Sequence, residues 1–157
     1  MNTRAAGMIV PFLLITGYTL SGAPQDGKQQ RSADLAYQAE MAHEGTDCPD
    51  SPSLEDRNEC LSDVRVETYK NYTQFFDALR EALIQNSPND ANALALDGTE
   101  VAWEKYRVTA CDAMVKVYDA GTVKHPGSTA PNAQTRCLIQ LTRSRMRDLK
   151  QLYEPTL

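Results

Sequence analysis

The chain has 157 residues, with 21 acidic and 16 basic side chains and a formal net charge of -5. A chain of this length is enough for one domain with one hydrophobic core. An acidic surface repels nucleic acid and anionic membranes, which argues against both as partners, whereas a basic protein would be attracted to it.

The first 23 residues indicate an export signal. Arg4 supplies a positive charge, residues 8–20 are largely apolar, and small residues at 21–23 offer a signal-peptidase site. A membrane span needs about 20 apolar residues, and this run is shorter and interrupted by a proline and a glycine. We therefore expect a signal peptide over residues 1–23 and a periplasmic or secreted chain without stable membrane insertion. The alternative is a short apolar N-terminal helix.

The next segments are expected to lead from a linker into one long helix. Residues 24–46 are polar, which predicts a flexible linker with a possible short helix over residues 35–44. The folded domain is expected over residues 47–157. Ser53, with acids at 55 and 56, predicts the start of a helix that reaches about Gln85. Its predicted inward stripe is Leu61, Val64, Thr68, Tyr72, Phe75 or Phe76, Leu79 and Leu83.

Two further helices are predicted, separated by a loop over residues 119–131 that holds two glycines and two prolines. The first runs from about Ala91, or from after Gly98, to about Tyr118. The second is capped by Asn132 and reaches about Tyr153. The predicted inward residues of the first are Thr99, Ala102 or Trp103, Tyr106, Ala110, Ala113 or Met114, and Val117. Those of the second are Leu138, Leu141, Arg145, Leu149 and Leu152.

No segment shows the period-2 pattern of a strand, so the expected fold class is all-α, a small bundle of long antiparallel helices. The four cysteines are Cys48, Cys60, Cys111 and Cys137. An even number in an exported chain predicts two disulfides, with three pairings possible in principle. A four-thiolate zinc site is the alternative, and the lack of a C-x-x-C pair disfavours it.

Helix geometry favours one pairing. If the last two helices are antiparallel neighbours, Cys111 and Cys137 lie roughly 12 and 8 Å from their connecting turn, so facing turns can be bridged. We therefore expect Cys111–Cys137, which leaves Cys48–Cys60 to tie the irregular segment onto the long helix. The bundle is then stapled by two disulfides.

The sequence shows no pattern typical of catalysis or metal binding. His43 and His125 have no companion at metal-ligand or triad spacing, and the carboxylates are scattered along helix faces. No phosphate-binding loop or nucleophile elbow is present. We therefore expect no catalytic residue, no metal and no cofactor. An enzyme that acts on the cell envelope is the alternative class.

Trp103, Arg107 and Cys111 lie four residues apart and therefore along one helix face. We expect the indole to pack into the core and Arg107 to form an ion pair with another helix beside it. Direct contact with a partner is the alternative. The same two interpretations, an ion pair with another helix or direct contact with a partner, apply to Arg145, eight residues after Cys137.

These residues resemble the LprI-type lysozyme inhibitor family. Its pattern is an early cysteine pair, W-x-x-[FY]-R-x-x-x-C, a glycine-bearing loop, and C-L-x-x-x-T-x-x-R-x-x-x-L. The residues that match it are Cys48 and Cys60, then Trp103, Tyr106, Arg107 and Cys111, then Gly121 and Thr122, and finally Cys137, Leu138, Thr142, Arg145 and Leu149. The loop has one glycine where two are usual. Val108 stands where the family often has an acid, which leaves open how Arg107 is neutralised.

The resemblance implies a helical envelope protein that inhibits a lysozyme or related muramidase by occluding its active-site cleft. Such a cleft holds two carboxylates, so a loop rich in hydrogen-bond donors suits it. The candidate inhibitory residues are Gly121, Thr122, Lys124, His125, Ser128 and Thr129. The alternative is an ordinary helix connector. Other functions left open are an immunity module against another cell-wall-degrading toxin and a structural envelope domain without inhibitory activity.

Overall fold

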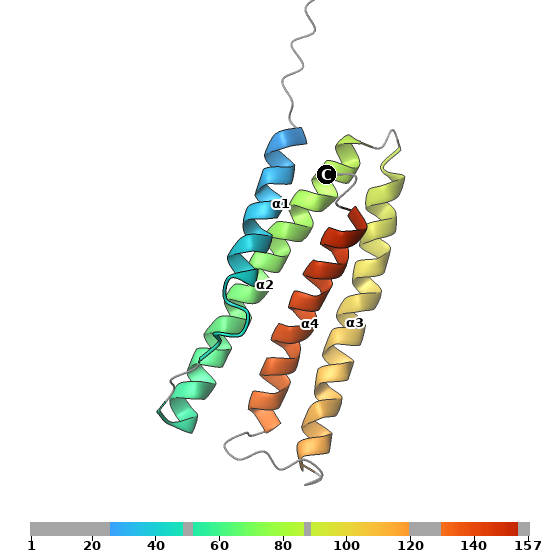
Figure 1. The fold of residues 1–157 in the computed structure, drawn as a ribbon. Coiled ribbons are helices and arrows are strands. Elements are labelled where there is room, and N and C mark those ends of the chain that lie inside the picture. Colours follow the sequence, from blue (N-terminus) through green and yellow to red (C-terminus); the bar gives the residue numbers. More distant parts are fainter. Residues whose placement is uncertain (1–25, 49–51, 87–88, 120–129, 154–157) are drawn as a thin grey trace, which may run out of the picture.

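The structure is a computed structural model whose described residues form four helices that alternate in direction along one axis (Figure 1). The residues that it describes are 26–48, 52–86, 89–119 and 130–153. The helices are α1 (Asp26–Met41), α2 (Leu54–Gln85), α3 (Ala91–Asp119) and α4 (Ala130–Tyr153). The described residues contain no strand, and the predicted all-α bundle is confirmed.

The central helix is α2, whose bounds agree with the prediction. Ser53 has extended backbone angles, and its hydroxyl accepts a hydrogen bond from the backbone N–H of Asp56 at 3.0 Å. This bond satisfies one of the amides that a helix N-terminus leaves unpaired. The predicted stripe is also confirmed, with Val64 half-buried. The buried residues of α2 are Leu61, Thr68, Asn71, Tyr72, Phe75, Ala78, Leu79, Ala82 and Leu83.

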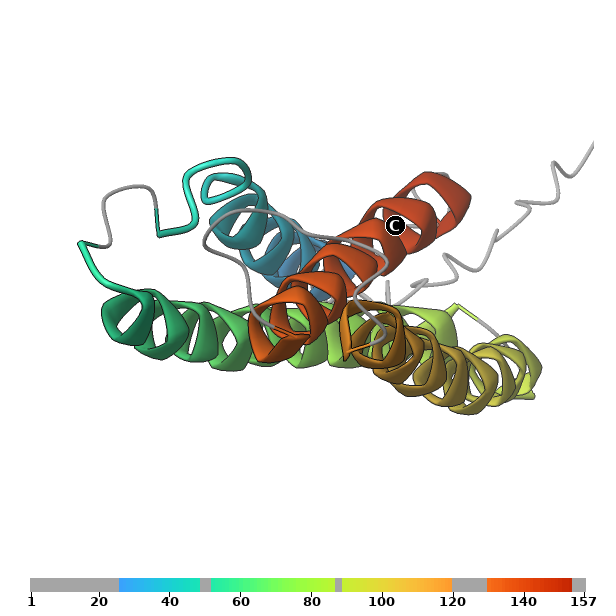
Figure 2. The same cartoon turned by 90° about the horizontal axis from the view of Figure 1, so that it is seen from below.

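The other helices are arranged around α2. Helix α1 packs along α2, and α4 packs against both α2 and α3, whereas α2 and α3 touch each other less (Figures 1 and 2). Leu79 of α2, Leu96 of α3 and Met146 of α4 meet in the main core and are fully buried. Within the described ranges, no helix has the length and apolar character that a membrane span requires.

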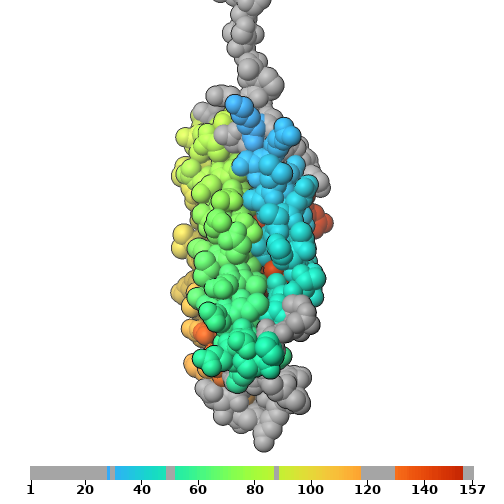
Figure 3. Space-filling model, turned by 90° about the vertical axis from the view of Figure 1, so that its left-hand side faces the viewer, coloured from blue at the N-terminus to red at the C-terminus, as the bar shows by residue number. Residues whose placement is uncertain are grey.

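Helix α1 differs from the prediction because it starts at Asp26. Residues 26–34, for which a flexible linker was expected, are therefore helical. Ala33, Ala36 and Glu40 are buried at steps of three and four residues and contact the core or side chains of α2. Figure 3 shows α1 lying along α2. A stripe of two alanines and a glutamate gives little hydrophobic periodicity, which is why the sequence pattern missed this helix.

The inward face of α3 also differs from the prediction. Tyr106, Met114 and Val117 are exposed. The side that faces the bundle carries Ala93, Leu96, Glu100, Trp103, Arg107 and Cys111, which recur at steps of three and four. Charged residues within this stripe shifted the prediction toward apolar positions on the outer face. The helix is continuous through Gly98.

Helix α4 starts at Ala130, so Asn132 is not its cap but lies buried in its first turn. Leu149 is buried as predicted, whereas Leu152 is exposed. The helix is turned so that its most buried side includes Arg143 and Met146. Arg143 was not among the predicted inward residues of this helix, because an arginine is rarely buried unless it is paired.

Both predicted disulfides are present, and no cysteine is free, which excludes the zinc-site alternative. Cys48–Cys60 ties the segment after α1 to α2, with the Cα atoms 6.0 Å apart. Cys111–Cys137 joins α3 to α4, with the Cα atoms 5.5 Å apart. On the chain-entropy model, closing loops of these lengths stabilises the fold by about 3 kcal/mol for each bridge.

Leu79→Ala is expected to lower the free energy of unfolding by about 2 to 5 kcal/mol, because it opens a cavity where three helices meet. Leu94→Ala makes the same chemical change at a side chain that is 64% exposed. It is expected to change stability by less than about 0.5 kcal/mol. Urea unfolding followed by helical circular dichroism measures both, and equal effects would contradict this assignment of the core.

Candidate functional site

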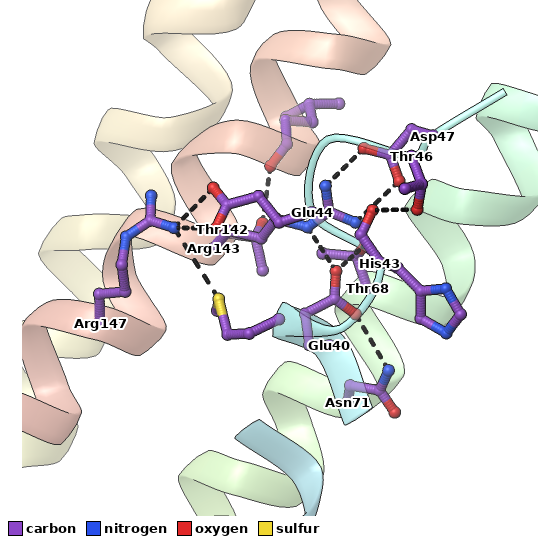
Figure 4. A network of polar contacts seen from close by, with 12 residues as sticks. Glu40, His43, Glu44, Thr46, Asp47, Thr68, Asn71, Thr142, Arg143 and Arg147 are labelled. Carbon is purple, nitrogen blue, oxygen red and sulfur yellow. Dashed lines mark hydrogen bonds and ion pairs between the residues drawn. The ribbon is translucent and has the colours of Figure 1, made fainter. Parts of the chain in front are cut away.

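The most deeply buried charges meet where α1, α2 and α4 come together (Figure 4). The Arg143 side chain is 4% exposed, and its Nε donates to Glu40 Oε1 at 2.6 Å. Its Nη2 donates to Asp47 Oδ1 at 2.9 Å. From α2, Thr68 Oγ1 donates to Glu40 Oε1 at 2.7 Å and Asn71 Nδ2 donates to Glu40 Oε2 at 3.0 Å. Both Glu40 oxygens are thus hydrogen-bonded, as a buried carboxylate requires.

This network joins segments that are about a hundred residues apart in the sequence. Asp47 directly precedes Cys48, so the Cys48–Cys60 disulfide holds the Asp47 carboxylate close to α4. Burial alone would lower the pKa of Arg143, but its hydrogen bonds to Asp47 and Glu40 outweigh that effect and the pKa is raised. Arg143 therefore stays charged in the folded protein.

Two further ion pairs lie nearer the solvent. One connects α4 to α1, and the other connects α4 to the turn after α1. Arg147 Nη1 lies 2.7 Å from Glu44 Oε1, and Lys150 Nζ lies 2.7 Å from Asp34 Oδ1. Both pairs are partly exposed, and exposed pairs contribute about 0 to 1 kcal/mol each. The buried Arg143 network is therefore the pairing that matters most to the fold.

A pocket of about 370 Å³ opens beside this network. Its lining includes Glu40, Asp47 and Arg143, whose charged groups are already paired with one another. His43 and Asp63 also line it and are exposed. Among the described residues, no group of three histidine, cysteine or acidic side chains could hold a metal ion. Because its charged groups are paired with one another, the network acts as a structural element.

The tryptophan motif forms a second cluster between α2, α3 and α4. Trp103 is half-buried against the core, and its ring centroid lies 5.0 Å from that of Tyr72. The guanidinium carbons of Arg107 and Arg145 lie 5.3 and 5.8 Å from the indole centroid. Arg107 also lies 5.0 Å from the ring centroid of Tyr69. Cation–π contacts of this kind fix both guanidinium groups against the aromatic rings.

The ion pair of Arg107 differs from the expectation, because its partner lies on the same helix. Arg107 Nε and Nη2 donate to Glu104 at 2.9 and 3.1 Å. Glu104 also accepts a hydrogen bond from the Tyr69 hydroxyl of α2 at 2.8 Å. Glu104 therefore supplies the negative charge that Val108 does not, and it links α3 to α2.

Arg145 forms a pair between two helices. Its Nη2 lies 3.6 Å from Glu100 Oε2 of α3 and donates to Thr99 Oγ1 at 2.9 Å. Glu100 Oε2, the Tyr72 hydroxyl and Arg145 Nε are buried and make no hydrogen bond of ordinary geometry with described residues. Burial raises the pKa of Glu100. The negative charge of Glu104 raises this pKa further, whereas Tyr72 and Arg145 lower it without cancelling the rise. Burial, together with Glu100, also raises the pKa of Tyr72.

The remaining predicted residues fall into three groups. Thr142 and Leu149 are buried, and Thr142 Oγ1 donates to the carbonyl of Leu138 at 2.7 Å. Tyr106 is exposed on the outer face of α3. The candidate inhibitory residues lie outside the part of the chain that the structure describes. They are Gly121, Thr122, Lys124, His125, Ser128 and Thr129.

Arg143 and Glu40 were missed by reasoning from the sequence. Arg143 lies four residues after Ile139 and three before Met146, both of which are buried. Glu40 lies four residues after the buried Ala36. A charged residue in register with a buried stripe is a signal for a buried pair, but it is visible only once the stripe has been assigned correctly.

The family model described as Lysozyme inhibitor LprI matches residues 48–149. The chain belongs to this family. The match spans both disulfides, the Trp103 cluster and Arg143, while the partners of Arg143, Glu40 and Asp47, precede the matched range in this LprI-family chain. No curated protein and no solved structure matches the chain.

Arg143→Ala is expected to lower the free energy of unfolding by about 3 to 5 kcal/mol, because it leaves the buried Glu40 carboxylate without its counter-charge. Arg147→Ala, four residues along the same helix, removes a side chain that is 42% exposed in its pair with Glu44. Its expected effect is at most about 1 kcal/mol. Chemical denaturation distinguishes the two, and a mild Arg143 variant would show that the network is dispensable.

Glu100→Gln tests the raised pKa of Glu100. Because the folded protein takes up this proton at higher pH than the unfolded chain, Glu100 adds stability as the pH falls from neutral toward its ordinary pKa of 4.5. The parent should therefore gain stability relative to Glu100→Gln over that window. Unfolding curves at several pH values measure this, with Glu59→Gln at an exposed site as the control for a lost charge. A relative loss for the parent would contradict the assignment.

Proposed function

We propose that this protein is exported and inhibits a lysozyme or a related muramidase by occluding its active-site cleft. The observation that carries the proposal is membership of the lysozyme inhibitor family over residues 48–149. The net charge of -5 supports it, because an acidic inhibitor attracts a basic enzyme and speeds the encounter.

The scaffold supports this function by its rigidity. A segment that enters a cleft loses less entropy on binding if its ends are already held in place. Residues 120–129 connect α3 to α4, and the Cys111–Cys137 disulfide joins these two helices. Gln134 of α4 also donates to Asp112 of α3 at 2.6 Å. Both links hold together the two helices that carry the candidate loop.

The composition of the loop suits a muramidase cleft, which holds two carboxylates. Thr122, Ser128 and Thr129 contribute hydroxyl donors, Lys124 contributes an ammonium group, and His125 contributes a ring N–H. In the proposed mechanism these donors engage the cleft and exclude substrate, and the helices act as the support.

The direct test is a lysis assay with the oxidised chain at increasing concentration and a fixed amount of lysozyme. A second muramidase and a cell-wall amidase are assayed in parallel. Saturable loss of muramidase activity supports the proposal. Inhibition of the amidase alone would favour an immunity module instead, and a folded chain that inhibits no muramidase would contradict the proposal.

A triple variant, Thr122→Ala with Lys124→Ala and Ser128→Ala, is expected to abolish inhibition while the helical circular dichroism stays unchanged, because it removes donors and no core residue. The matched control changes the same residue types at exposed helical positions, namely Thr109, Lys105 and Ser62. The control is expected to inhibit like the parent. If the loop variant also inhibits like the parent, the loop is only a connector and the contact lies on the helix faces.

A further inference from the structure

A half-open groove of about 410 Å³ lies between α2, α3 and α4. Its apolar lining comes from Val66 of α2, Val108 of α3 and Leu138 of α4. Val66 and Val108 are exposed, so apolar surface faces solvent on two of its sides. Ligand pockets commonly measure about 300 to 1,000 Å³, and this groove falls within that range.

The charged groups of the groove differ from those of the rest of the molecule. Arg107 is fixed by Glu104 and by the rings of Tyr69 and Trp103. Arg65 is exposed and makes no ion pair with any residue that the structure describes. The lining contains these two cations and one anion, Asp112, in a chain whose net charge is -5. Because Arg107 is already neutralised by Glu104, Arg65 is the cation of the groove that is left for an anion to pair with.

We propose that this groove binds a single-chain amphiphile with an anionic head group, such as a fatty acid. The alkyl chain lies against Val66, Val108 and Leu138, where it covers exposed apolar surface. The head group lies beside Arg65, whose guanidinium has no other charged partner among the described residues. A cationic amphiphile would be repelled by Arg65, and a neutral one would leave Arg65 unpaired. This inference does not depend on the proposed inhibition of lysozyme.

Trp103 reports binding directly, since it is the only tryptophan and its ring contacts Arg107, which lines the groove. Its fluorescence is followed while octanoate, decanoate or dodecanoate is added below micelle formation. Saturable binding with one site is expected. The affinity should rise about fourfold for each added methylene until the groove is filled. Dodecanol and dodecyltrimethylammonium are expected to bind more weakly than dodecanoate.

Two pairs of variants locate the site. Val108→Asp is expected to weaken dodecanoate binding by about tenfold or more, because it places an anion in the apolar wall. Val101→Asp, at a 74% exposed valine of the same helix that does not line the groove, should bind like the parent. Arg65→Gln should weaken dodecanoate by about threefold to fivefold and leave dodecanol unchanged. Arg31→Gln, at an exposed position of α1, is its control.

Several results would overturn the proposal. They are an affinity that does not depend on chain length, an equal loss in Val101→Asp and Val108→Asp, and an Arg65→Gln variant that binds dodecanoate like the parent. Binding to anionic phospholipid vesicles without binding to the monomeric amphiphile would also overturn it. Circular dichroism is recorded throughout, and a signal that appears only as helix is lost would count against a groove.

Discussion

The guanidinium of Arg143 is buried among three helices, and an unpaired charge in such a place would destabilise the fold by several kcal/mol. Pairing it requires Glu40 from α1 and Asp47 from the segment before Cys48. Glu40 in turn accepts hydrogen bonds from Thr68 and Asn71 of α2. Apolar contacts have no direction and tolerate sliding. These hydrogen bonds are directional, so they set how far α1, α2 and α4 can slide past one another.

The remainder of the molecule is attached to this framework by different interactions. Helix α3 is linked to α4 by Cys111–Cys137 and by the contacts of Arg145 with Trp103, Glu100 and Thr99. It touches α2 less, which leaves the groove open between them. The groove adjoins the Cys111–Cys137 disulfide, since Asp112 and Leu138, which line it, are neighbours of these cysteines in the sequence. The parts proposed to bind partners are thus carried by helices that are cross-linked to the framework.

The sequence predicted the elements whose signals are local. Helix α2 has a serine cap and an apolar stripe, and the Cys111–Cys137 pairing follows from helix depth alone. Helix α1 buries alanines and Glu40, so no strong apolar pattern in the sequence predicts it. The Arg143 network could not be predicted, because its two sides are about a hundred residues apart and each side alone resembles a solvated charge. The sequence likewise did not identify Glu104 as the partner of Arg107, because the faces of α3 had not been assigned correctly.

A double-mutant cycle between Glu40 and Arg143 tests the central claim most directly. The measured quantity is the free energy of unfolding of Glu40→Leu, Arg143→Leu and the double variant. We expect each single change to be strongly destabilising and the double variant to regain much of the loss, because the two most deeply buried charges are then both removed and Asp47, which loses its partner, is 16% exposed. The coupling should be about 2 kcal/mol or more. Additive effects would show that the two side chains are independent and would contradict the account.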